Sequence, residues 1–178
     1  MDEQRIMKIA EKFRRAIEVA RNKGHFDSDI MFRNFPRGCC GDSSYLLAEY
    51  LKEKSIDSIW YSASRGDWTH AWLVVKDYRV KAPTKKMFTW PEDQWPVLKQ
   101  YGVMNPEQTI TIEKYEEDDL VGGIIIDITG DQFVDYSIPT YVGYQDMFHK
   151  SFSFVQAHDY DGLDARLRTL YKKIEQYL

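Results

Sequence analysis

Two kinds of hydrophobic pattern follow each other along the chain, first helical and then strand-like. Over residues 3–23 apolar side chains recur every three or four positions, with charged residues opposite. This spacing predicts an amphipathic helix, which Gly24 would end. A second helix is expected from about Ser43 to Lys54, with Asp42 or Ser43 as its N-cap.

After this second helix the hydrophobic period changes to two, which is typical of strands. The expected strands are 58–63, 69–75, 109–115 and 123–129. A connection of about 77–107, with four prolines and two tryptophans, separates the second strand from the third, and long connections of this kind are often functional. A closing helix is expected over 162–177. Helices at the two ends with strands between them predict an α+β fold with an antiparallel sheet, and 178 residues suit a single domain spanning 1–178.

Composition and charge exclude several classes of function. The formal net charge is −4, whereas nucleic-acid binders usually carry a basic excess. No apolar run approaches the ~20 residues of a membrane span, and the first residues lack the apolar core of a signal peptide. We therefore expect no nucleic-acid or membrane partner and a cytoplasmic location, where thiols stay reduced, with a delivered effector as the alternative. The oligomeric state stays open.

The segment FPRGCCGDSSYLLAEYL places the two cysteines side by side, directly before the second predicted helix. The N-terminal end of a helix lowers the pKa of a nearby thiol through its unpaired N–H groups and its dipole. Cys40 is nearer this end than Cys39, so Cys40 is the preferred nucleophile and Cys39 a packing residue. Gly38 and Gly41 would allow a tight turn and the approach of a substrate.

A thiol mechanism also needs a base and a group that orients the base. In THAWLVV, strand alternation places His70 and Trp72 on the same face. Asp127 interrupts an isoleucine run in GIIIDIT, where a carboxylate needs a partner such as an imidazole N–H. The other histidines are expected to be surface or capping residues: His25, His149 and His158.

These three motifs, in this order, resemble the papain-like fold, specifically its transglutaminase-like branch. The resemblance rests on G-x-C-G-D, H-A-W and D-I-T within residues 35–133, and IDITGDQF is similar to the strand that supplies the third catalytic group in that branch. It implies a nucleophile helix packed on an antiparallel sheet, flanked here by the terminal helices. It also implies a triad of Cys40, His70 and Asp127. The family's usual upstream oxyanion donor is not obvious, and weaker candidates for oxyanion or substrate contacts are Asn34, Gly41, Trp72 and Gln132.

Several interpretations of these residues stay open. The cysteines could be inert buried thiols, which is the commoner fate of an intracellular cysteine. A zinc site using Cys39, Cys40 and His70 is disfavoured, because structural zinc pairs usually stand two to four residues apart. We expect no metal or cofactor. The favoured function is a thiol hydrolase that cleaves an amide bond of a protein or peptide, as a peptidase or glutamine deamidase. An acyltransferase of the transglutaminase type and a catalytically silent binding domain are the alternatives. Trp90 and Trp95 of the 77–107 connection could line the substrate cleft.

Overall fold

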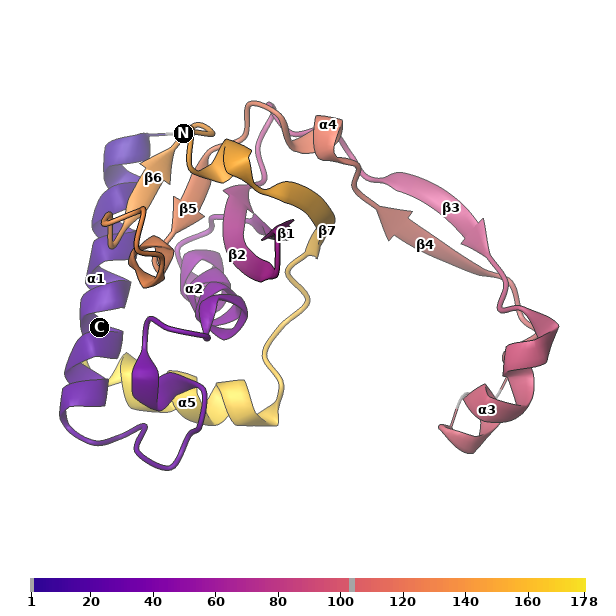
Figure 1. Ribbon diagram of the computed structural model, residues 1–178, viewed down its shortest axis with the longest axis horizontal. Coiled ribbons are helices and arrows are strands. Elements are labelled where there is room, and N and C mark those ends of the chain that lie inside the picture. Colours follow the sequence, from indigo (N-terminus) through magenta and orange to yellow (C-terminus); the bar gives the residue numbers. More distant parts are fainter. Residues whose placement is uncertain (1, 103–104) are drawn as a thin grey trace.

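A five-stranded antiparallel sheet forms the centre of the protein in this computed structural model, which describes residues 2–102 and 105–178 (Figure 1). Its strands follow the order β6-β5-β2-β1-β7. They span Ser58–Arg65 (β1), Trp68–Val75 (β2), Ile125–Asp127 (β5), Tyr141–Gly143 (β6) and Ser153–Asp159 (β7). The fold is therefore α+β with an antiparallel sheet and flanking helices, as the sequence pattern predicts.

The strand alternation predicted for β2 is correct and separates two apolar clusters. Leu73 and Val75 point into a cluster with the apolar stripes of helices α1 (Glu3–Asn22), α2 (Cys40–Glu53) and α5 (Ala165–Glu175). Trp72 and Val74 point into a second, aromatic-rich cluster that includes Tyr136, Phe148 and Phe152. The sheet is thus buried on both faces, which fixes the direction in which each β2 side chain points.

Helix α2 begins three residues earlier than predicted. Cys39 occupies the N-cap position without a side-chain cap, and Asp42 and Ser43 lie in the first turn. Gly38, with a φ of +73°, turns the chain just before Cys39. The backbone N–H of Ser43 then donates to Cys39 O at 2.8 Å, which closes the first helical turn. Cys40 is therefore the first helical residue and does not precede the N-cap.

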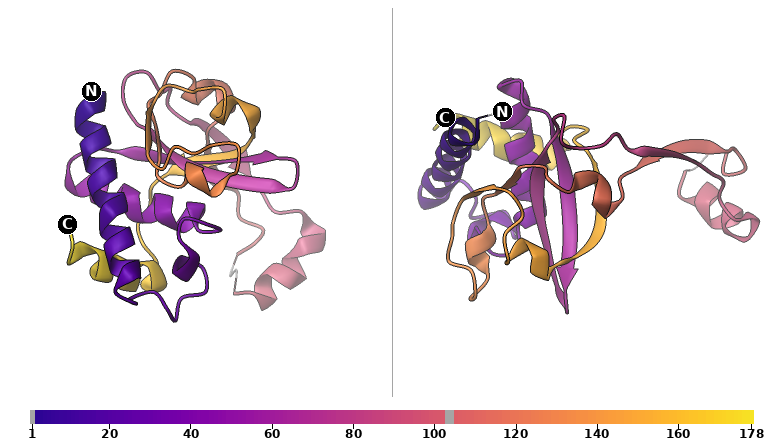
Figure 2. Two further views of the ribbon diagram at one scale, coloured as in Figure 1. Left: turned by 60° about the vertical axis from the view of Figure 1, so that its left-hand side comes forward. Right: turned by 90° about the horizontal axis from the view of Figure 1, so that it is seen from above.

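The connection predicted as a loop has regular structure of its own. It contains β3 (Thr84–Phe88), η2 (Glu92–Gln94) and α3 (Trp95–Gln100), and β3 pairs with β4 (Ile110–Lys114) as a separate two-stranded ribbon. The ribbon extends away from the main sheet and carries α3 at its far end (Figures 1 and 2). The segment 109–115 thus contains a strand, but this strand lies outside the main sheet. It pairs with the polar run TKKMF, whose sequence does not alternate between apolar and polar residues.

Short elements complete the chain: η1 (Phe32–Asn34), α4 (Glu117–Leu120), η3 (Gly130–Gln132) and η4 (His149–Ser151). The sequence pattern predicts none of them, nor strands β6 and β7. None of the helices in the described part of the chain combines the length and apolarity needed to cross a bilayer.

Candidate active site

Helix α2 and strand β2 bring Cys40 and His70 together. The hydroxyl of Ser44 donates to Ala71 O at 3.3 Å and links the first turn of α2 to the residue after His70. Burial raises the pKa of the Cys40 thiol, and the imidazole of His70 is the main group that lowers it. The histidine expected to react with the cysteine therefore acts on the ionisation of its thiol.

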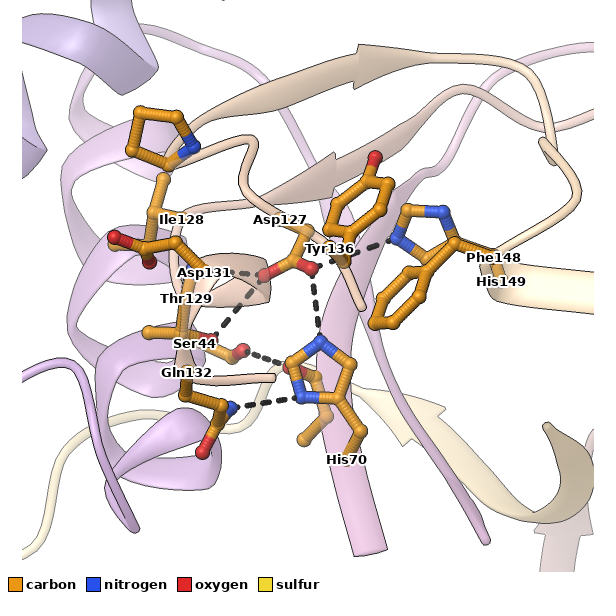
Figure 3. A network of polar contacts seen from close by, with 12 residues as sticks. Ser44, His70, Asp127, Ile128, Thr129, Asp131, Gln132, Tyr136, Phe148 and His149 are labelled. Atoms are coloured by element: carbon orange, nitrogen blue, oxygen red, sulfur yellow. Dashed lines mark hydrogen bonds and ion pairs between the residues drawn. The ribbon is translucent and has the colours of Figure 1, made fainter. Parts of the chain in front are cut away.

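Asp127, the last residue of β5, orients the imidazole from its other side. His70 Nε2 donates to Asp127 Oδ2 at 2.8 Å, and both side chains are buried. The second carboxylate oxygen accepts the backbone N–H of Thr129 at 2.8 Å and its hydroxyl at 3.2 Å. Figure 3 shows the carboxylate held between these groups. The structure thus contains the imidazole–carboxylate pair of the predicted arrangement.

At all three groups, interactions with the neighbouring side chains together shift the pKa more than burial does. Burial alone would raise the pKa of Cys40, but the hydrogen bond and charge of His70 lower it below the usual thiol value. Burial would lower the pKa of His70, whereas the charge and hydrogen bond of Asp127 raise it to about 9. The pKa of Asp127 is held well below its usual range against burial, chiefly by the charge of His70. These directions favour a thiolate beside an imidazolium at neutral pH.

Gln132 lies at the thiol side of the imidazole. Its Nε2 is 3.2 Å from His70 Nδ1, and its Oε1 accepts the backbone N–H of Gly38 at 3.2 Å. The amide also lowers the pKa of Cys40. Of the weaker candidates, Gln132 is the one whose side chain the fold places beside the reacting groups.

Cys39 has the character of a packing residue. Its side chain is buried, and its sulfur contacts Pro36 O at 3.4 Å and the hydroxyl of Ser43 at 3.5 Å. Burial raises the pKa of its thiol to about 12. The two adjacent cysteines therefore differ in ionisation because only Cys40 faces the imidazole.

An open cleft of about 410 Å³ leads to Cys40. Its walls come from three segments, and the lining residues are Arg37, Gly38, Cys40, Asp67, Trp68, Thr69, Gln132, Phe133 and Val134. The indole of Trp68 is 67% exposed and the side chain of Val134 is fully exposed, so both are available to a ligand. The volume is in the range of small-molecule and peptide side-chain sites.

Other predicted site residues lie elsewhere. Asn34 is exposed in η1 and does not line the cleft. Trp72 is buried and stacks on Tyr61 at 4.6 Å between ring centroids, so it is a core residue. Gly41 lies within α2, where an added Cβ would meet only Trp60 at 3.8 Å, so neither a turn nor lack of space requires glycine there.

Trp90 and Trp95 are also absent from the cleft lining. The indole N–H of Trp95 donates to Trp90 O at 2.9 Å in the ribbon that extends from the sheet. The two tryptophans therefore pack against their own segment, because the 77–107 connection folds as an arm and does not cover the site.

Arg14 of α1 holds the segment that carries Asp127 and Gln132. Its guanidinium forms two 2.8 Å hydrogen bonds with the Asp131 carboxylate and also donates to Ile128 O at 2.6 Å and Pro139 O at 2.7 Å. Its position is a signal in the sequence, since an arginine within the apolar stripe of a helix needs a buried partner. The helical pattern alone predicts only charged residues opposite the apolar stripe.

His149 was also assigned wrongly from the sequence as a surface or capping residue. Its side chain is fully buried, and its Nε2 lies 3.5 Å from Asp127 Oδ2. Its neighbour Phe148 and aromatic residues that are distant in sequence, such as Trp72, bury the ring. Asp146, three residues earlier, was the one local hint.

Among the described residues no group of three or more His, Cys, Asp or Glu side chains is arranged to hold a metal ion. No protein-family model matches the chain, and the comparisons with curated proteins and with solved structures gave no match either.

Proposed function

We propose that the protein is a thiol hydrolase that cleaves an amide bond through a thioester on Cys40, as a papain-like enzyme of the transglutaminase-like branch. The observation that carries this proposal is the buried hydrogen bond from His70 to Asp127 at 2.8 Å, together with the lowering of the pKa of Cys40, at the start of α2, by the same imidazole. A nucleophile, a base and a group that orients the base are the three parts that acyl transfer by a thiol requires.

The first step uses the thiolate and the imidazolium together. The Cys40 sulfur attacks the amide carbonyl carbon, and the carbonyl electron pair moves to the oxygen. His70 then donates its proton to the leaving nitrogen as the C–N bond breaks, which leaves a thioester and a free amine. Asp127 stays ionised and stabilises the imidazolium before the proton leaves.

Water completes the cycle. His70, now neutral, removes a proton from water as the oxygen attacks the thioester carbon, and the C–S bond breaks to give the acid and the thiolate. In both steps hydrogen-bond donors must stabilise the negative charge that forms on the carbonyl oxygen. We assign the backbone N–H of Cys40, at the helix start, and the side-chain amide of Gln132, which lies at the same side of His70.

The cleft favours a substrate with an apolar group beside the scissile amide. Trp68, Phe133 and Val134 provide apolar surface next to Cys40, and Arg37 adds a positive group at the rim. Exposed aromatic side chains of this kind commonly bind apolar side chains of peptides. We therefore expect a peptide or a protein side-chain amide with a neighbouring apolar residue.

Asp67 gives a specific reason to keep acyl transfer as a second candidate. Its carboxylate lines the same cleft as Cys40 and could hold a primary amine as the acceptor in place of water. Hydrolysis remains the first candidate because it needs no acceptor other than water.

The experiment is to trap the acyl-enzyme with a peptide p-nitroanilide panel and follow its decay by mass spectrometry, with and without added primary amine. Decay in water supports a hydrolase. Decay that requires amine and is lost in Asp67→Asn, while the acylation rate is kept, supports a transferase. Absence of a Cys40 acyl adduct with every amide and ester would favour the silent binding domain.

A further inference from the structure

His149 is a buried titratable group that the proposed triad does not use. Its Nδ1 lies 2.7 Å from Asp146 Oδ1, and its backbone N–H donates to the same oxygen at 2.9 Å. Its Nε2 has no hydrogen-bond partner within the described residues, although the atom is fully buried. A buried nitrogen without a partner calls for a physical explanation.

The nearest charge to that nitrogen is the carboxylate of the triad. Nε2 lies 3.5 Å from Asp127 Oδ2, the same oxygen that accepts His70 Nε2 at 2.8 Å. Figure 3 shows the two imidazoles on either side of this carboxylate. One oxygen of Asp127 is therefore shared by two histidines from different parts of the fold.

The rest of the environment fixes the His149 ring. Trp72 of β2 meets it edge-on at 5.0 Å, and Tyr141 of β6 lies at 5.0 Å between centroids. Tyr136 donates its hydroxyl to the other oxygen of Asp146 at 2.9 Å. The titratable groups that face His149 are thus two carboxylates, Asp127 and Asp146, and the phenols of Tyr136 and Tyr141.

Carboxylate chemistry determines what the ring can do in this place. An ionised carboxylate only accepts, so Nδ1 must carry a proton to bond with Asp146. Nε2 can hold Asp127 only as a second N–H donor, since a bare lone pair would face negative charge. Nδ1 therefore faces Asp146 as a donor, and Nε2 is the nitrogen that faces Asp127.

We propose that His149, held by Asp146, is a positioning residue that fixes the Asp127 carboxylate and keeps it ionised for His70. The inference deepens the proposed function and rests on it for the role of the triad. It extends the buried polar chain from Cys40 through His70 and Asp127 to His149 and Asp146. The direction of the Asp127 pKa, which the charge of His149 helps to lower, agrees with this role.

The test uses alkylation of Cys40 by iodoacetamide at pH 6, which reads thiolate formation without any substrate. We expect His149→Gln to slow alkylation about tenfold, the order seen when a residue that orients a reactive side chain is removed. His158→Gln is the matched control, because His158 stacks on Trp60 and bonds Tyr45, away from Asp127. It should leave the rate unchanged.

A double-mutant cycle separates positioning from packing. In an Asp127→Asn background, His149→Gln should cause no further loss, because its effect acts through the carboxylate. An equal loss in both backgrounds, or no loss in either, would overturn the inference. Loss of folded protein is monitored by thermal unfolding, and Asp146→Asn provides a second variant that keeps the ring in place.

A direct readout is the ¹⁵N NMR signal of the ring. The Nδ1 of His149 should show the shift of a protonated ring nitrogen, and an unprotonated Nδ1 would contradict the bond to Asp146 and with it the proposal. If the alkylation effects appear but no amide is cleaved, the proposed hydrolase fails while the positioning role stands. If amides are cleaved but the double-mutant cycle shows no coupling between His149 and Asp127, the positioning role fails while the proposed hydrolase stands.

Discussion

His70 Nε2 and Asp127 Oδ2 lie 2.8 Å apart between strands β2 and β5, with both side chains buried. The pairing of the two strands, with Leu73 opposite Ile126, places the two residues at the same end of the sheet. Two oppositely charged groups in this setting stabilise each other's ionised forms, and the paired charges account for the directions of their pKa shifts.

The first prediction follows from this pair. Asp127→Asn keeps the shape of the side chain but removes the charge that stabilises the imidazolium. We expect turnover to fall by roughly 10³- to 10⁴-fold, as at other catalytic histidines that lose their carboxylate. Steady-state kinetics beside an inactive His70→Ala variant measure this, and near-normal turnover would reduce the triad to a dyad.

The second prediction concerns pH. Hydrolysis should rise as Cys40 ionises below the usual thiol pKa and fall above about pH 9, where His70 loses its proton. Alkylation of Cys40 should not fall above pH 9, because the thiolate persists there. An alkaline decline of both rates in parallel would argue against His70 as the acid that protonates the leaving group.

Stability should follow the same ionisation of His70. Since the folded state raises the His70 pKa from 6.5 to about 9, this stabilisation is complete below pH 6.5 and is lost as pH rises through 9. Urea unfolding at pH 7 and pH 10 should therefore show a decline that is smaller in His70→Gln. An identical pH dependence in both proteins would contradict the shift.

A third prediction separates the two cysteines. Cys40→Ala should abolish rapid alkylation at pH 6 and leave the fold intact, whereas Cys39→Ser should retain it. The reason is that burial raises the pKa of Cys39 to about 12, while His70 lowers the pKa of Cys40. Mass mapping after a brief reaction identifies the labelled residue, and label on Cys39 would reverse the assignment.

A fourth prediction tests the close packing around Asp127. A Cβ at Gly130 would lie 2.7 Å from the ring of Tyr136 and 2.9 Å from Asp127 Oδ2. Because the ring and the carboxylate are both held in place, Gly130→Ala should displace Asp127 and reduce turnover. Gly41→Ala is the control, since its Cβ meets only Trp60 at 3.8 Å. Equal activity of the two variants would mean that the Asp127 segment adapts freely.

The fifth prediction concerns Arg14, which holds that segment from α1. Arg14→Met would leave the Asp131 carboxylate and two backbone carbonyls without their donor. We expect the free energy of unfolding to fall by about 2 kcal/mol, the order seen when a buried acceptor such as Ile128 O loses its donor. Arg15→Met, at the exposed neighbouring position, should change it little. Chemical denaturation measures both, and similar values for the two variants would exclude the anchoring role.

The local pattern predicted the residues that carry their own periodicity. The helices of the N- and C-terminal segments, the two-faced strand β2 and the isoleucine run around Asp127 all follow from side-chain spacing. The residues Cys40, His70 and Asp127 were predicted from a thiol at a helix start, a carboxylate in an apolar run and the resemblance to the papain-like fold.

Contacts between segments that are distant in sequence determined the features that side-chain spacing did not predict. Helix α2 starts earlier than the pattern predicts because Gly38 and the buried Ser43 extend the helix to Cys40. Strand β4 pairs with a strand whose sequence has no apolar pattern. His149 is buried because residues from β2, β6 and the 128–140 segment pack around it, together with its neighbour Phe148. Burial of a polar residue depends on which surfaces the folded chain brings together, and side-chain periodicity carries no information about that.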